Sequence, residues 1–143
     1  LLKEEAERLG VELDETALNN FDAFAAMLVD WNSRINLTAI TDPMGIVYKH
    51  FADSLTAFAA VDVPQGAGFI DVGTGGGFPG IPLLIARPDL HGVMLDSTKK
   101  KLMYVDYCIK VYLYLFSFAY IVHKNNLFLR RKHRHRRYKH QKH

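Results

Sequence analysis

The sequence has a single cysteine, Cys108, and no long run of apolar residues. One cysteine cannot form an internal disulfide, so a reducing compartment is expected. The main apolar stretch, residues 111–122, is interrupted only by Ser117 and is short for a membrane-spanning helix. The acidic, helix-forming start of the chain is unlike a signal peptide. We therefore expect a cytoplasmic protein, and its 143 residues are enough for one ordinary domain.

Acidic residues are nearly absent from the last third of the chain. Through Thr98 there are 5 basic and 14 acidic residues, a net charge of −9, whereas from Lys99 onward there are 13 and 1, a net charge of +12. Such asymmetry is typical of a basic nucleic-acid-binding segment or of a join between unlike segments. The five histidines of this part, at 123, 133, 135, 140 and 143, match no zinc module, so no metal is expected.

The stretch Gly68–Gly80 is the most informative part of the sequence. Residues 69–72 predict a buried strand, glycines at 73, 75, 76, 77 and 80 predict a tight turn, and residues 81–86 predict a short helix. Such a turn lets a ligand approach the backbone and aims free N–H groups of the helix start at that ligand. A cofactor site is therefore expected. A P-loop is excluded, because Ile81 and Pro82 stand where Lys and Ser/Thr are required.

The glycine spacing alone leaves two cofactor classes open. Gly75, Gly77 and Gly80 spell the G-x-G-x-x-G fingerprint of dinucleotide sites. Asp71 before the turn would repel a phosphate, and Pro79 removes an N–H donor that a pyrophosphate needs.

S-adenosylmethionine fits this stretch better, because it carries an ammonium and a sulfonium but no phosphate. Its ribose diol suits Asp96, which ends the next predicted strand, residues 93–96. Alternation of strand, helix and strand predicts a parallel sheet with right-handed crossovers. An NAD-linked oxidoreductase remains a distant alternative.

The first 60 residues predict helices. Asp14 is expected to cap a helix that runs to about Ser33, whose apolar stripe at three- and four-residue spacing is typical of a core-facing side. Asp42-Pro43 predicts the start of a further helix after a loop over residues 36–41. On that helix Lys49, His50, Asp53 and Ser54 share about one turn, and spacing alone favours a solvated face for them.

Four motifs in order resemble one family, the bacterial small-subunit ribosomal RNA guanine-N7 methyltransferases also called RsmG or GidB. They are Trp-Asn-x-x-Ile-Asn-Leu-Thr-Ala-Ile at 31–40, His-x-x-Asp-Ser at 50–54, Asp-Val-Gly-Thr-Gly-Gly-Gly-Phe-Pro-Gly-Ile-Pro at 71–82 and Leu-Asp-Ser at 95–97. The resemblance covers about residues 12–98.

The resemblance implies an α/β, Rossmann-like S-adenosylmethionine-dependent methyltransferase fold with N-terminal helices. The implied substrate is a guanine of 16S ribosomal RNA, methylated at ring nitrogen 7, with no stable protein partner. By position in the motifs, the implied cofactor-binding residues are Asp71, Gly73, Thr74, Gly75, Gly77, Phe78 and Asp96. The implied substrate-side residues are Arg34, Asn36, His50, Asp53 and Ser54. No catalytic residue is assigned.

After Ser97 the sequence departs from the expected pattern of an amphipathic helix and further strands. We expect a helical part over 1–60, the start of a methyltransferase domain over 61–98, and a poorly ordered hydrophobic and basic segment over 99–143. A frameshift, a retained non-coding stretch or a misassembled gene model is favoured for this last segment over an evolved module. The fold is then truncated or replaced at its carboxyl end, with half a cofactor site and impaired activity. The alternative is a non-catalytic, basic-tailed protein that binds RNA or a membrane, the membrane being less favoured.

Overall fold

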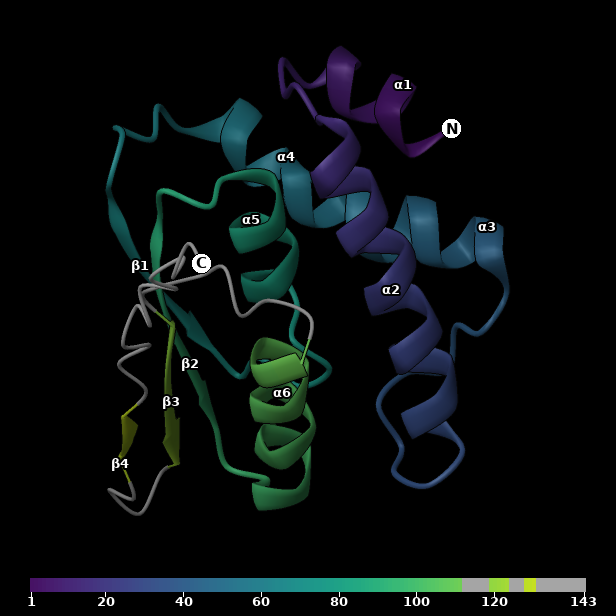
Figure 1. Ribbon diagram of the computed structural model, residues 1–143, viewed down its shortest axis with the longest axis vertical. Coiled ribbons are helices and arrows are strands. Elements are labelled where there is room, and N and C mark those ends of the chain that lie inside the picture. The colour runs from purple at the N-terminus through teal and green to yellow at the C-terminus, as the bar shows by residue number, and fades with distance from the viewer. Residues whose placement is uncertain (112–118, 124–127, 131–143) are drawn as a thin grey trace, which may run out of the picture.

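The structure, a computed structural model, describes residues 1–111, 119–123 and 128–130 (Figure 1). The basic residues 131–143 and most of the apolar stretch, residues 112–118, lie outside the described residues, and with them the expected RNA-binding tail and membrane-associated segment. The elements in chain order are α1 (Leu2–Arg8), α2 (Glu15–Asn32), α3 (Pro43–Gly45), the π-helix η1 (Ile46–Ala52), α4 (Asp53–Ala60), β1 (Gly68–Val72), α5 (Gly80–Ala86), β2 (His91–Asp96), α6 (Lys99–Val111), β3 (Ala119–His123) and β4 (Phe128–Arg130).

The sheet has the strand order β1-β2-β3-β4. β1 pairs with β2 in parallel, with Gly68 opposite His91, and β2 pairs with β3 in parallel, with Gly92 opposite Ala119. β4 returns antiparallel to β3. Helices α5 and α6, which connect these parallel strands, lie on the same side of the sheet, and α2 lies beyond them (Figure 1). The predicted parallel α/β arrangement is confirmed.

Helix α2 has the expected boundaries and role. The Asp14 side chain accepts a hydrogen bond from the Ala17 amide at 2.7 Å, as its position before the apolar stripe predicts. The stripe is buried, with Phe21 and Leu28 almost fully covered. Because the N-terminal helices share one hydrophobic cluster with α5, β2 and α6, they are packed onto the sheet layer through that core.

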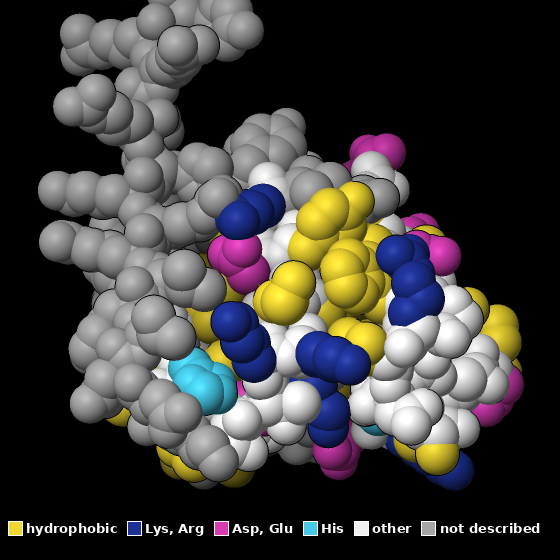
Figure 2. Space-filling view, turned by 90° about the horizontal axis from the view of Figure 1, so that it is seen from below, with side chains coloured by type: hydrophobic (Ala, Val, Ile, Leu, Met, Phe, Trp, Pro, Cys, Tyr) yellow, Lys and Arg dark blue, Asp and Glu magenta, His cyan; other side chains and the backbone are white. Residues whose placement is uncertain are grey.

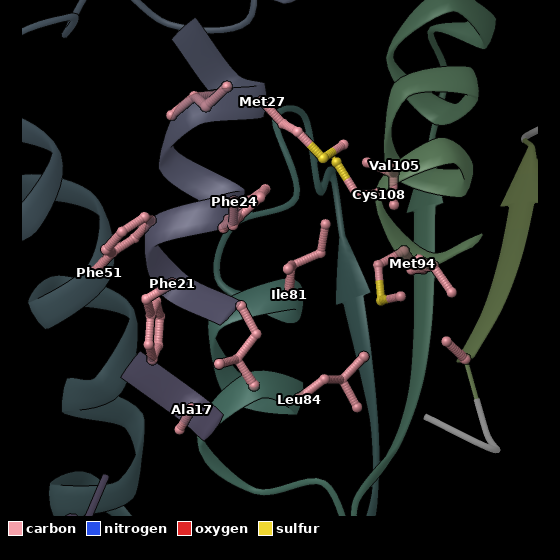
Figure 3. Packing of buried hydrophobic residues seen from close by; sticks show 14 of the residues in the cluster. Ala17, Phe21, Phe24, Met27, Phe51, Ile81, Leu84, Met94, Val105 and Cys108 are labelled. Carbon is pink, nitrogen blue, oxygen red and sulfur yellow. The ribbon is translucent and has the colours of Figure 1, made fainter. Parts of the chain in front are cut away.

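Phe24 of α2 lies at the centre of this cluster and is 2% exposed (Figure 3). Its ring centroid is 5.7 Å from that of Phe51 in η1, 5.4 Å from Phe78 in the glycine-rich loop and 6.5 Å from Tyr104 in α6. Aromatic pairs at such distances add favourable ring contacts to the burial of apolar area. One side chain thus connects the helical part, the loop and the last described helix.

The segment after Asp42 departs from the single regular helix that the pattern predicts. Asp42 does cap the start, accepting from the Gly45 amide at 2.7 Å, but residues 46–52 then form a π-helix before α4 begins. Ile46, Phe51 and Ala52 are the buried members of this wider turn. π-helical turns are rare and occur frequently at functional sites.

The expectation that no amphipathic helix and further strand follow Ser97 is wrong for the described residues. Helix α6 buries Leu102, Val105, Cys108 and Ile109 at three- and four-residue spacing, and β3 then extends the parallel sheet. The three lysines that open α6 mask this pattern in the sequence, because they change the composition where the helix begins. Among the helices of the described residues, none is long and apolar enough to span a bilayer.

We predict that Phe24→Ala lowers the free energy of unfolding by about 3–5 kcal/mol, because it leaves a cavity at the junction of α2, η1, the loop and α6. Chemical denaturation followed by circular dichroism measures this loss. Val29→Ala is the matched control on the same helix, since Val29 is 47% exposed and its truncation should change the stability by less than about 0.5 kcal/mol. Equal losses for the two variants would contradict the central position of Phe24.

Candidate cofactor site

The glycine-rich loop follows the carboxyl end of β1 and is shaped by its own backbone. Gly73, Gly75 and Gly77 have φ angles of 76°, 55° and 94°, which residues with a Cβ rarely adopt. The Gly73 and Thr74 amides both donate to the Leu95 carbonyl of β2, at 2.8 and 3.0 Å. At Gly73, which is exposed, a Cβ would meet nothing within 4 Å, so open space lies above the backbone there. A ligand can therefore approach the loop closely.

Asp71 closes the inner side of this loop. It is 6% exposed, and its Oδ2 accepts from the Thr74 hydroxyl at 2.7 Å and from the Gly80 amide at 2.9 Å. Burial raises the pKa of Asp71 above its ordinary value, although these two hydrogen bonds act in the opposite direction. A Cβ at Gly80 would lie 2.8 Å from Asp71 Oδ2. Asp71 therefore ties the loop to the start of α5, and its Oδ2 is already occupied by two hydrogen bonds from within the protein.

Asp96 links the same loop to the carboxyl end of β2. Its Oδ2 accepts from the Gly75 amide at 2.8 Å and its Oδ1 from the Thr98 amide at 2.7 Å. Burial alone would raise the pKa of Asp96, but the hydrogen bonds from Thr98 and Gly75 outweigh it and the pKa lies below its ordinary value. Asp96 is consequently ionised at neutral pH. An ionised carboxylate accepts hydrogen bonds from hydroxyl groups more strongly than a neutral one.

The start of α5 does not offer the free amides that the sequence predicts. The Gly80 amide donates to Asp71 and the Ile81 amide to the Gly77 carbonyl at 2.7 Å. The Gly77 and Phe78 amides both donate to the Thr74 carbonyl at 2.9 Å. The loop is thus organised by internal hydrogen bonds, and the expectation that the helix start aims free N–H groups at a ligand is wrong for Gly80 and Ile81.

The second group of predicted residues lies beside the loop. Asp53 and Ser54 of α4 line a shallow pocket of about 330 Å³ together with Phe78 and Pro79. Ser54 is 6% exposed and its hydroxyl donates to the His50 carbonyl at 2.5 Å, so it serves the helix. The His50 ring stacks on Phe78 with centroids 4.3 Å apart. The motif residues 50–54 and the glycine-rich loop therefore meet in one place.

Arg34 and Asn36 belong to the segment after α2. The Arg34 guanidinium pairs with Asp30 at 2.6 Å and lies 4.9 Å from the centroid of the Trp31 ring. Asn36 is exposed, and nothing described ties its side chain to the loop. This segment is near His50 through Thr38, whose Oγ1 is 2.7 Å from His50 Nε2.

Two residues that organise the site were not singled out from the sequence. The Asn32 side chain accepts from the Leu37 and Thr38 amides at 2.8 and 3.0 Å and donates to the Thr38 carbonyl at 2.9 Å. Thr38 then reaches His50. A signal was present, since an Asn at the last residue of a helix before a polar loop is well suited to bond loop backbone groups.

Comparison with known proteins identifies the family of the chain. A sequence model of the GidB family, described as rRNA small subunit methyltransferase G, matches residues 17–123. The chain belongs to this family. Its fold is accordingly the α/β, Rossmann-like fold of an S-adenosylmethionine-dependent methyltransferase family.

Curated relatives named ribosomal RNA small subunit methyltransferase G show the same family. The one from Desulforamulus reducens is 40% identical over 109 residues, which are 76% of this chain and 45% of that protein. The one from Clostridium novyi is 43% identical over 106 residues, 74% of this chain and 44% of that protein. The one from Caldanaerobacter subterraneus is 39% identical over 114 residues, 80% and 48% respectively. The matched part of the chain covers less than half the length of each of these relatives.

The family match also corrects the extent of the resemblance. The motifs alone place its end at about residue 98, whereas the matched region runs through residue 123, the last residue of β3. Helix α6 and β3 are therefore family elements. The first lysines of the basic part, 99–101, begin α6, whose buried side keeps an ordinary apolar pattern.

We predict that Asp71→Ala destabilises the chain far more than Asp71→Asn. Alanine leaves the Thr74 hydroxyl and the Gly80 amide buried without their acceptor, at roughly 1–3 kcal/mol each. Asparagine retains a carbonyl oxygen for them. Urea unfolding at neutral pH measures the two losses, with Asp62→Ala as the exposed control. Similar losses for the alanine and asparagine variants would show that the two hydrogen bonds do not hold the loop.

The pKa of Asp71 gives this comparison a pH dependence. Because its folded pKa is raised, the ionised carboxylate is the form that folding disfavours, and Asp71→Asn removes that penalty. The stability of Asp71→Asn relative to the unmodified chain should therefore be greatest above the folded pKa. It should decline as the pH falls from the folded pKa toward the unfolded value of 3.8.

Proposed function

We propose that this chain carries the cofactor-binding half of an S-adenosylmethionine-dependent methyltransferase that acts on ring nitrogen 7 of a guanine in 16S ribosomal RNA. The hydrogen bond from the Gly75 amide to Asp96 Oδ2 is the observation that carries the proposal. It brings an ionised acid from the end of β2 against the partly buried backbone of the glycine-rich loop that follows β1. Ligands of doubly wound α/β sheets bind at the carboxyl ends of the strands.

The residues present fit the cofactor. Gly73 offers open space at an exposed backbone, and each Asp96 oxygen has a second lone pair for a ribose hydroxyl. Asp71 and Thr74 are buried and bonded to each other, so we assign them to holding the loop. Gly77 has a positive φ, and a Cβ there would meet Ile81 Cδ1 at 2.5 Å, which assigns it to the turn. Phe78 borders the pocket shared with α4.

Bound S-adenosylmethionine supplies an electrophilic methyl group. Guanine nitrogen 7 carries a free lone pair and no proton, so its attack requires no general base. The protein's contribution is then to hold the guanine in line with the methyl carbon and to keep water away, and orientation alone contributes several kcal/mol. The lack of an assigned catalytic acid or base in the sequence is consistent with this chemistry.

The surface next to Asp96 has the charge that an RNA substrate requires. Lys99, Lys100 and Lys101 open α6 directly after β2, and the first two are exposed. Figure 2 shows Lys and Arg side chains around a hydrophobic patch on the face seen from below. Tyr107 of α6 is 41% exposed and its ring lies 5.3 Å from that of Trp31. Lysines neutralise phosphates and exposed aromatic rings stack on bases, so we propose that RNA binds here.

We further propose that Arg34, Asn36 and Asp53 face the RNA, because Arg34 and Asn36 are exposed beside α2 and Asp53 lines the pocket next to Phe78. A cytoplasmic location follows from a ribosomal RNA substrate. Activity of the 143-residue chain should be impaired, since β1 has only β2 beside it among the described strands and the crevice is therefore walled on one side.

We predict that isothermal titration calorimetry of the 143-residue chain detects S-adenosylmethionine binding with a dissociation constant well above micromolar. Asp96→Ala should weaken it further by roughly ten- to a hundredfold, since an interaction with a charged acceptor worth about 1.5–3 kcal/mol is lost. Asp89→Ala is the control, because Asp89 pairs with Arg87 away from the loop. Micromolar affinity of the unmodified chain would contradict the half-site, and no effect of Asp96→Ala would contradict the assigned ribose contact.

A methyl-transfer assay with labelled S-adenosylmethionine and small-subunit RNA tests the reaction, and mapping the labelled nucleotide tests nitrogen 7 of guanine. The second candidate, a non-catalytic basic protein that binds RNA or a membrane, rests on residues outside those described. RNA binding that survives Asp71→Ala but is lost when residues 124–143 are deleted, without methyl transfer, would favour that candidate.

A further inference from the structure

His50 has an unusual position for a residue expected to face the substrate. Its ring lies nearly parallel to the ring of Phe78, with an interplanar angle of 11° and centroids 4.3 Å apart. The other two aromatic neighbours of Phe78, Phe24 and Phe51, are tilted and more distant, at 5.4 and 6.3 Å. His50 thus makes the closest of these ring contacts to the glycine-rich loop.

The His50 ring is itself held by a hydrogen bond from a different segment. Thr38 Oγ1 lies 2.7 Å from His50 Nε2 and also accepts from the Ile40 amide at 3.0 Å. The Thr38 backbone is fixed by the Asn32 side chain, which bonds both its amide and its carbonyl. The chain of contacts therefore runs from the end of α2 through Thr38 and His50 to Phe78.

We infer that His50 is a positioning residue for the glycine-rich loop, with Thr38 setting the orientation of its ring so that the ring lies flat on Phe78. His50 therefore acts on the cofactor through the loop and does not contact the RNA; this role toward the cofactor rests on the function proposed above. The same contacts connect the glycine-rich loop to the segment 33–40, which carries Arg34 and Asn36. The proposed substrate side and the proposed cofactor side are therefore held in place by the same residues.

Alternative roles for the ring predict different behaviour of variants. If His50 only fills space, His50→Phe preserves the stack on Phe78 and changes nothing. If the Thr38 bond orients the ring, His50→Phe and Thr38→Val both release the loop, and Thr38→Ser, which keeps the hydroxyl, does not. Thr56→Val is the control for the same change close to the loop, because Thr56 lines the pocket beside Phe78 while its exposed hydroxyl bonds the Asp53 carbonyl of its own helix.

Hydrogen exchange of the purified 143-residue chain, read at individual amides, tests the inference without cofactor. The Gly77 and Phe78 amides report on the loop through their bonds to Thr74, and the α2 amides of Phe24 and Leu28 report on the core. We expect Thr38→Val and His50→Phe to accelerate exchange at Gly77 and Phe78 by about fivefold, the loss of one hydrogen bond, with the α2 amides unchanged. Thr38→Ser and Thr56→Val should match the unmodified chain.

Unchanged loop exchange in both Thr38→Val and His50→Phe, or equal acceleration at the loop and in α2, would overturn the inference. Calorimetry with S-adenosylmethionine at high concentration separates it from the proposed function. Weaker binding by Thr38→Val together with normal binding by Thr38→Ser supports both the positioning role of His50 and the proposed cofactor. Loop-specific acceleration in a chain that binds no S-adenosylmethionine refutes the proposed cofactor and leaves the positioning of the loop by His50 in place.

Discussion

The hydrogen bond between the Gly75 amide and Asp96 fixes the distance between the loop after β1 and the end of β2, and the rest of the site depends on that distance. The Leu95 carbonyl, one residue earlier, receives the Gly73 and Thr74 amides, so three consecutive loop amides are bonded to the end of one strand. A parallel pair places both carboxyl ends at one edge of the sheet, which makes this bonding possible. The loop is therefore preformed by β2.

The two acids around the loop serve different purposes because their surroundings differ. Asp71 lies under the loop, and burial raises its pKa; Asp96 lies at the strand end, where hydrogen bonds outweigh burial and lower its pKa. The charge of Asp96 also raises the pKa of Asp71. Both acids thus organise the loop backbone, but only Asp96 has a lowered pKa and stays ionised there. The sequence, with an aspartate near each strand end, does not distinguish the two.

Much of the fold follows from local patterns in the sequence. Asp14 and Asp42 predict helix starts correctly because capping is decided by neighbouring residues, and the strand that ends at Asp96 follows from its apolar run. The contacts of His50 with Thr38 and Phe78 could not be predicted in this way, because they join segments 12 and 28 residues apart through a π-helix that no local pattern indicates. Helix α6 was missed because lysines on its exposed side obscured an ordinary buried side.

The face of β1 that points away from α5 explains why a preformed loop need not bind its cofactor tightly. Ile70 and Val72 alternate with Asp71 along the strand and are 67% and 73% exposed, whereas Asp71 faces the helix layer and is buried. Strands of parallel α/β sheets are normally covered on both faces, and their ligands bind where walls rise on both sides of the crevice. Among the described residues, β1 has one sheet neighbour, so the loop and Asp96 form a single wall. Organisation of the loop and enclosure of the ligand contribute separately to binding affinity. The described residues organise the loop but enclose the ligand on one side.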